Sequence, residues 1–170
     1  HLAWTGESLR QNDKVVKSLL TKGMLFTMKD RKQLFKVIGD TISDLIPRYK
    51  ALMKRNQIEI STTPHYHPIL PLLLDFKSTL DAMPNAPLPK HAQYNGGQER
   101  AVAHVVSAKA AHKQFFGEIP RGMWPAEGGV SHATLLLMAE HGVEWAATGQ
   151  GVLANSLAKS ELSSIDKNDY

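Results

Sequence analysis

QIEISTTPHYHP, residues 57–68, decides the fold, because a strand pattern in it runs directly into a loop of functional side chains. Residues 57–61 alternate polar and apolar side chains, which is the period of a β-strand. Prolines and histidines crowd residues 62–68, so this part is expected to be a loop. In parallel α/β folds, loops at the carboxyl ends of strands build the functional site.

Two further strand candidates repeat this arrangement later in the chain. Residues 120–124 run into the loop PAEGGVS, and residues 143–148 run into Gly149-Gln150-Gly151. Helical patterns accompany them at residues 98–116, 132–141 and 152–158. Such alternation predicts an α/β fold with parallel strands and flanking helices. Because three strands cannot close a barrel, we expect either one part of a larger barrel or a small open sheet.

The first third of the chain is predicted to be helical. Asn12 or Asp13 can cap a short helix that Gly23 ends. Thr27 and Asp30 have the spacing of a capping box, and the helix that follows is predicted to run toward Arg55. Pro47 lies inside that helix, and we expect a kink or break there because proline cannot donate the backbone hydrogen bond.

The composition fits one globular core and excludes several classes of protein. Hydrophobic residues make up 42% of the 170 residues, which excludes a wholly disordered chain. No apolar run is long enough to cross a bilayer, so we expect no membrane partner and a cytoplasmic location. The absence of cysteine excludes disulfides and thiolate metal sites. The chain begins at His1 without an initiator methionine, and we expect a segment of a longer protein.

The positive charge is concentrated in the first third of the chain. Residues 10–55 hold twelve basic and four acidic residues, a balance of +8 within a net charge of +4. These charges alternate with apolar residues at helical spacing, which favours a solvated helix face over a nucleic-acid site. We therefore expect no nucleic-acid partner.

Glu127 is the first candidate for chemistry. It lies between Trp124-Pro125 and two glycines, shortly before a predicted helix whose N-terminus favours negative charge. An ionised carboxylate there suits a nucleophile or an electrostatic stabiliser, and Trp124 offers a flat apolar face for a sugar ring. The alternative, that Glu127 merely caps the next helix, is equally favoured by its position.

Two histidines and a second glutamate are further candidates. His65 and His67 have the spacing of a metal-ligand pair if the strand continues that far, with a third ligand from Glu59, Glu127 or His132. The flanking prolines favour a loop, and therefore hydrogen bonding or packing over metal ligation. Glu59 lies between two isoleucines and is expected to point either to solvent or into a barrel lumen.

Two stretches resemble a known family. Residues 57–72, QIEISTTPHYHPILPL, resemble the second conserved stretch of glycoside hydrolase family 57, and residues 122–131, GMWPAEGGVS, resemble its third. Within that family, the two stretches most resemble the amylase-like or amylopullulanase-like branch. We therefore interpret residues 1–170 as a single segment, the central portion of the family's catalytic barrel.

The resemblance implies a fold, a reaction and a site. It implies an incomplete-looking (β/α)7 barrel and a retaining mechanism on α-glucans, by hydrolysis or glucan transfer, with no metal and no cofactor. Glu127 matches the catalytic nucleophile. Glu59 and His67 match residues that line the subsite at the cleaved bond, Trp124 flanks it, and His65 is expected to bind substrate beside them.

Two parts of the family pattern are missing. The first motif, a His-Gln-Pro-Tyr-like stretch, is absent, and so is the acid/base aspartate of a later strand. Asp166 and Asp169 lie in a polar tail with no strand before them and are not assigned that role. We therefore expect the parent protein to be an enzyme and this segment to lack its proton donor, which alone supplies roughly 10²–10⁴ in rate.

Two alternatives remain at this point, together with one expectation about assembly. The first alternative is a metal-dependent polysaccharide hydrolase or deacetylase that uses His65 and His67. The second is a non-catalytic glucan-binding fragment. We also expect self-association through the incomplete barrel edge, because unpaired strands and bare apolar faces tend to associate.

Overall fold

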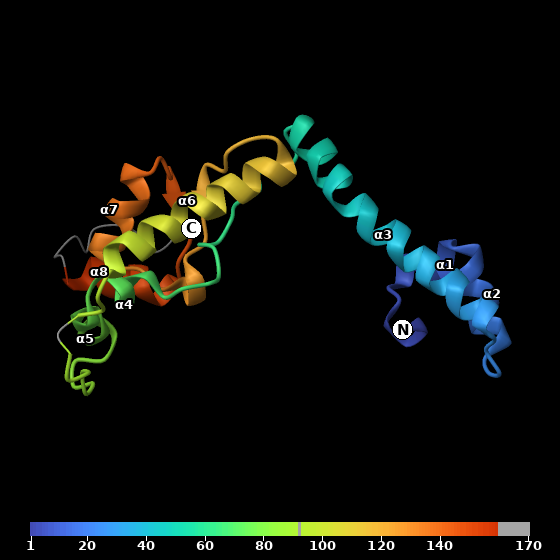
Figure 1. Cartoon of the computed structure of the whole chain (residues 1–170), viewed down its shortest axis with the longest axis horizontal. Helices are drawn as coiled ribbons and strands as arrows, with labels where there is room; N and C mark the ends of the chain where they lie inside the picture. The colour runs from blue at the N-terminus through green and yellow to red at the C-terminus, as the bar shows by residue number, and fades with distance from the viewer. Residues whose placement is uncertain (92, 160–170) are drawn as a thin grey trace. The chain divides into compact units, whose positions relative to one another are not determined.

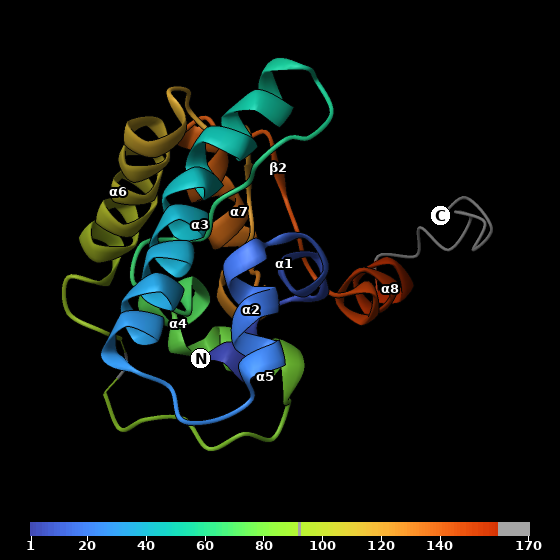
Figure 2. The same ribbon diagram turned by 90° about the vertical axis from the view of Figure 1, so that its right-hand side faces the viewer.

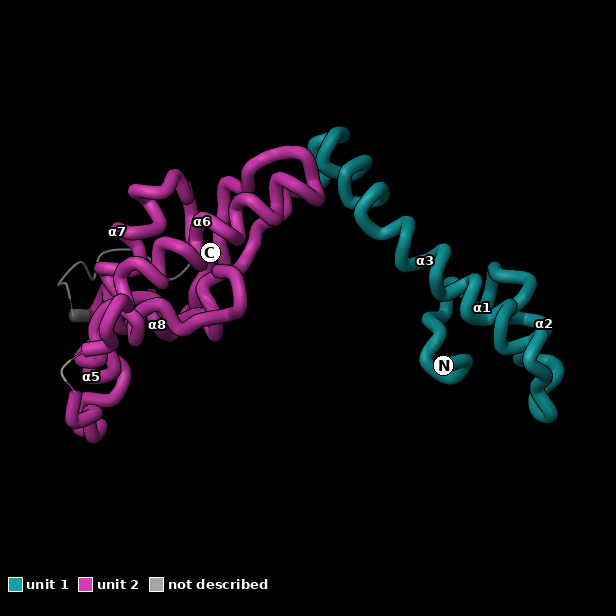
Figure 3. Tube along the Cα trace, in the orientation of Figure 1, with its two compact units in different colours: residues 1–58 teal, residues 59–170 magenta. Residues whose placement is uncertain are grey.

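A computed structural model describes residues 1–91 and 93–159 of the chain (Figure 1). The chain divides into two compact units, residues 1–58 and residues 59–170 (Figure 3). Each unit has its own secondary structure and is described by itself.

Unit 1 is helical, as predicted. It contains a 3₁₀ turn at Leu2–Trp4 and the helices α1 (Glu7–Asn12), α2 (Lys14–Lys22) and α3 (Met28–Lys54). Asp13 caps α2 by accepting a hydrogen bond from the Val16 amide at 2.9 Å, and Gly23 ends it with a φ of 72°. The predicted cap and stop signals of this helix are confirmed.

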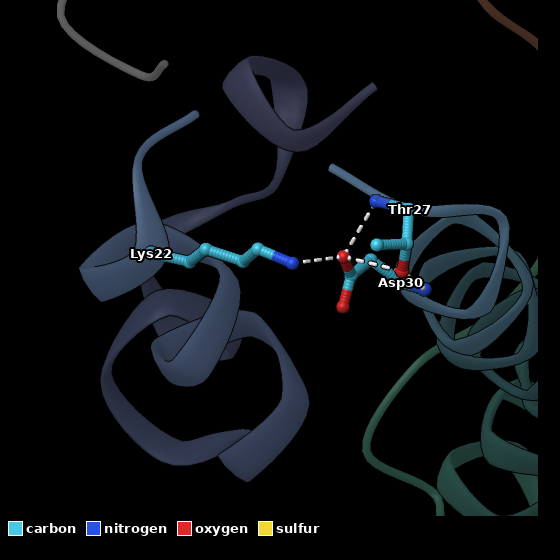
Figure 4. A network of polar contacts seen from close by, with 3 residues as sticks. All are labelled: Lys22, Thr27 and Asp30. Carbon is cyan, nitrogen blue, oxygen red and sulfur yellow. Dashed lines mark hydrogen bonds and ion pairs between the residues drawn. The ribbon is translucent and has the colours of Figure 1, made fainter. Parts of the chain in front are cut away.

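The capping box at the start of α3 also binds the end of α2 (Figure 4). The Asp30 carboxylate accepts hydrogen bonds from the Thr27 amide at 2.7 Å, the Thr27 hydroxyl at 2.8 Å and the Lys22 ammonium at 2.5 Å. The hydrogen bond from Lys22, followed by those from Thr27, lowers the pKa of Asp30 to about 2. A single carboxylate thus joins two consecutive helices.

α3 continues through Pro47, so the predicted break at this residue is wrong. The helix is continuous from Met28 to Lys54, so the one backbone donor that proline lacks does not end it. No residue of α3 is buried, and its charged side chains form i,i+4 pairs such as Lys36–Asp40, with 2.6 Å between nitrogen and oxygen. This agrees with the predicted solvated face.

Unit 2 is the α/β part of the chain. Its helices are α4 (Leu70–Leu74), α5 (Thr79–Ala82), α6 (Gly97–Phe116), α7 (His132–Glu140) and α8 (Gln150–Lys159), with 3₁₀ turns at Phe76–Ser78 and Ala126–Gly128. Its strands are β1 (Gly122–Met123) and β2 (Trp145–Ala146), which are shorter than predicted. The predicted helices at 98–116, 132–141 and 152–158 are confirmed to within two residues at each end, whereas α4 and α5 were not predicted.

The strands of unit 2 are parallel. Gly122 lies opposite Trp145 and Met123 opposite Ala146 in the β1–β2 pair. On the other side of β1, Thr62 forms a parallel bridge with Met123, and the Trp124 amide donates to the Thr62 carbonyl at 2.7 Å. Three backbone segments therefore run side by side in one direction, with β1 in the middle.

The predicted strand at residues 57–61 is wrong, because pairing begins only at Thr62. One reason is that backbone groups of this segment bond to helices. Nε2 of the buried His112 in α6 lies 3.1 Å from the Ile60 carbonyl oxygen. The side chains alternate as predicted, but within residues 1–91 and 93–159, residues 57–61 pair with no neighbouring strand.

The core of unit 2 lies between α4, α6, α7 and the strands, with α6 and α7 side by side (Figure 1 and Figure 2). Its buried members are Leu70, Ala101, Val105, Ala108, Met123, Leu137, Met138 and Val143. Gly97 lets α6 approach α4 closely, since a Cβ there would lie 1.8 Å from the Leu73 carbonyl oxygen. An α/β arrangement with parallel pairing is therefore present, although the described residues do not form a barrel.

Candidate active site

The loops that follow the three parallel segments meet at one edge, as parallel strands require. His67, from the loop after Thr62, directs its Nε2 to Oε1 of Glu127, from the loop after β1, at 2.9 Å. The third loop joins them through Thr148, whose hydroxyl donates to the Gly128 carbonyl at 2.8 Å. Residues that are 60 positions apart in the sequence thus form one cluster.

Two buried prolines support this pair. Pro64 and Pro125 are almost fully buried, and each accepts at its carbonyl a backbone hydrogen bond from the turn that holds the functional residue. The His67 amide donates to Pro64 at 3.0 Å, and the Gly128 amide donates to Pro125 at 2.9 Å. These hydrogen bonds tie the two turns to buried residues, and the side chains of His67 and Glu127 extend into solvent. The Glu127 side chain is 76% exposed and that of His67 is 55% exposed.

The backbone of this cluster is unusual. Tyr66, His67 and Glu127 have φ values of 63°, 57° and 55°, in the left-handed region that favours glycine. Each such residue costs roughly 1–2 kcal/mol, and such strain gathers at functional sites. Elsewhere in the described residues, only Leu25 and Asn56 share this conformation among the non-glycine residues.

The position of Glu127 removes the helix-capping alternative. The cap of α7 is Ser131, whose hydroxyl accepts from the Thr134 amide at 3.2 Å. Glu127 instead lies in the preceding 3₁₀ turn, and its carboxylate accepts from His67. Because a carboxylate only accepts, Nε2 of His67 is the donor in this contact. Among the described residues, no group bonds Oε2 of Glu127.

The other predicted site residues lie at different distances from this pair. Trp124 directly follows β1, and 59% of its surface is exposed. His65 donates its backbone amide to the His104 carbonyl at 3.0 Å, while Nδ1 of its ring is buried without a hydrogen-bond partner. Its ring lies against Tyr66, with 4.3 Å between the centroids.

Glu59 lies at the opposite, amino-terminal end of the three segments. Its Oε1 accepts from the Trp145 indole at 2.7 Å, and its Oε2 is 3.6 Å from an Arg121 nitrogen. Arg121 also donates from Nε and Nη2 to Glu144, at 2.8 and 2.7 Å. The Arg121 hydrogen bond lowers the pKa of Glu144, and the same contact raises the pKa of Arg121. We call Glu59, Arg121, Glu144 and Trp145 the amino-end network.

The sequence analysis missed this network, although the sequence contained a signal for it. Arg121 and Glu144 are each the second residue of their predicted strands, and neighbouring parallel strands bring such positions together. Opposite charges at matched strand positions were therefore the available evidence.

The described residues give the metal alternative no support. In residues 1–91 and 93–159, no three histidine, aspartate or glutamate side chains lie close enough to hold a metal ion. His65 and His67 have separate partners, an aromatic ring and a carboxylate.

Asp166 and Asp169, which the sequence did not favour as acid/base, lie outside the described residues. No helix in the described part of the chain is long and apolar enough to span a membrane.

The comparison with protein families assigns the chain to a family. Residues 2–166 match the family described as Glycosyl hydrolase family 57. The chain belongs to glycosyl hydrolase family 57. Family membership supports a glycoside hydrolase or transferase that acts on α-glucans, and hence a glycan substrate. No curated protein and no solved structure matches the chain.

Proposed function

We propose that the Glu127–His67 cluster is the nucleophile side of a retaining α-glucan active site. The observation that carries the proposal is the 2.9 Å contact between the two side chains, which come from the two stretches that resemble the family's motifs. The carboxylate is exposed at the carboxyl edge of parallel segments, where α/β enzymes keep their chemistry.

The two oxygens of Glu127 have different tasks in this proposal. His67 holds Oε1, and Oε2 is left to attack the anomeric carbon of a glucosyl unit. The bond from that carbon to the leaving oxygen breaks as the glycosyl ester forms, and an acid protonates the leaving oxygen. Water then releases the sugar, or a second glucan accepts it in a transfer reaction.

In this proposal the proton donor comes from outside the described residues. Retaining glycosidases place their two carboxyl groups about 5–5.5 Å apart. In the described part of the chain, Glu59 and Glu144 are held in the amino-end network, at the other end of the strands from Glu127. We therefore propose that these 170 residues are the central part of a (β/α)7 barrel whose remaining strands supply the acid.

Trp124, His65 and Glu59 differ in how readily each could contact substrate. Trp124 offers a stacking surface beside the nucleophile, as its exposure allows. His65 fixes the loop of His67 through its backbone amide, which donates to the His104 carbonyl. Its ring binds substrate only if it turns outward, because Nδ1 is buried in this structure. Glu59 contacts substrate only if the Trp145 indole releases it, so we rank it last as a binding residue.

The nucleophile assignment is tested in the full-length protein that contains this segment. Glu127→Gln keeps the size of the side chain and removes its charge, and we expect kcat on maltoheptaose to fall roughly 10⁴-fold or more. Glu127→Gly in sodium azide should release a glucosyl azide of inverted configuration, because azide takes the place of the carboxylate. Glu118→Gln, at an exposed glutamate after α6, is the matched control. Wild-type turnover by Glu127→Gln would overturn the proposal.

A further inference from the structure

We infer that Tyr66 is a carbohydrate-stacking residue that binds a glucosyl ring next to the one attacked by Glu127. The inference rests on the proposed function of the Glu127–His67 cluster, and it adds a residue to which neither the motifs nor the family assignment gave a role. Three observations support it, namely exposure, backbone strain and the support of the ring.

The first observation is exposure. Tyr66 is 83% exposed, more than any other aromatic side chain in the described part of unit 2. It directly precedes His67, so its Cα lies about 3.8 Å from that of the residue holding the nucleophile. A large ring left in water beside a polar pair fits a surface that an apolar sugar face covers on binding.

The second observation is strain. The φ of 63° at Tyr66 is a genuine outlier for a bulky residue, for which glycine or asparagine would be the easier choice. The hydrogen bond of this turn runs from the His67 amide to the Pro64 carbonyl and does not involve the Tyr66 side chain. The turn therefore gives no reason for a tyrosine at this position, whereas a binding role does.

The third observation is that neighbouring rings hold Tyr66 in place. His65 lies against the tyrosine ring with 4.3 Å between centroids, and His104 of α6 meets it edge-on at 6.0 Å. The His65 amide is fixed in turn by the His104 carbonyl. A ring that is already oriented loses little freedom when a sugar packs on its open face, which favours affinity. The phenol oxygen can also bond to sugar hydroxyls.

The test measures maltoheptaose binding by calorimetry to the full-length protein carrying Glu127→Gln, so that the ligand is not consumed. Adding Tyr66→Ala should raise Kd about 10-fold, the loss expected for one aromatic contact. Adding Tyr66→Phe should change it less than about 3-fold, because the ring remains. Tyr94→Ala is the matched control, since Tyr94 is 43% exposed and lies under Arg100.

A second measurement keeps the inference testable if Tyr66→Ala does not fold. The full-length protein is labelled with 3-fluorotyrosine, and the ¹⁹F signal that disappears in Tyr66→Phe is assigned to Tyr66. Maltoheptaose should shift the signal of Tyr66. Binding without that shift, or with an unchanged Kd in Tyr66→Ala, would overturn the inference and leave the role of Glu127 standing. No binding of maltoheptaose at all would overturn both proposals.

Discussion

The two ends of the same three backbone segments in unit 2 are built on opposite principles. At the amino end, Glu59, Arg121, Glu144 and Trp145 satisfy one another through hydrogen bonds and ion pairs. At the carboxyl end, Glu127 is exposed, has one partner and lies on a strained backbone. At the amino end, the polar groups bond to one another and hold the segments together. At the carboxyl end, only Oε1 of Glu127 has a partner among the described residues. Only the second arrangement leaves a group available for substrate.

The largest effect should be a loss of stability in Gly122→Ala, because the Trp145 indole lies directly against Gly122. In Gly122→Ala, the added Cβ would lie 1.9 Å from Cε2 of the indole, so the ring or the strand must move. We expect a loss of about 3 kcal/mol in the free energy of unfolding, measured by urea denaturation.

Gly149→Ala is the control at the carboxyl end, because nothing lies within 4 Å of the position of its Cβ. It should change stability by less than about 1 kcal/mol. Equal losses in the two variants would show that the two ends do not differ in packing.

The next effect should appear in activity alone. His67→Ala removes the donor to Oε1 of Glu127, and we expect kcat/KM of the full-length protein to fall about 10²-fold. Stability should change by less than about 1 kcal/mol, because both side chains are largely exposed. His132→Ala, at an exposed histidine that begins α7, is the control. A large loss of stability in His67→Ala would mean that this end is also a structural clamp.

The smallest effect should be a pH dependence at the amino end. Arg121 lowers the pKa of Glu144 below its ordinary value, so the pair stabilises the fold above the unfolded-state pKa. This contribution is lost as the pH falls through the lowered pKa of the folded state, in the acid range below about pH 4.5. Glu144→Gln should therefore narrow the difference between the Tm values at pH 7 and pH 3. Added salt should reduce the effect, since the pair is exposed. The same narrowing in Glu118→Gln would show that it does not come from this pair.

Helix limits were predictable because their signals are local. Asp13, Thr27 with Asp30, and Ser131 each contact an amide within three residues, so short stretches of sequence contain the information. The strand at residues 57–61 was wrong because pairing depends on distant partners. Alternation predicted which side chains share a face. It could not show that the Ile60 carbonyl faces the His112 ring of α6 and not a neighbouring strand.

The candidate site was predictable in part for the same reason. Glu127, His67 and Trp124 stand in stretches that resemble family motifs, so their chemistry could be anticipated without coordinates. The amino-end network required the register of β1 against β2, and Tyr66 required its exposure. Neither property can be obtained from residue type alone.

The left-handed backbone at Tyr66, His67 and Glu127 has a consequence for attempts to make the protein more robust. Glycine at such a position relieves roughly 1–2 kcal/mol of strain and costs about 0.4–1 kcal/mol through greater freedom of the unfolded chain. A library that is selected only for heat resistance or expression would therefore enrich glycine at these three positions. Each such gain in stability would remove a side chain that we propose for the glycan site, so the selection needs a glucan in the assay.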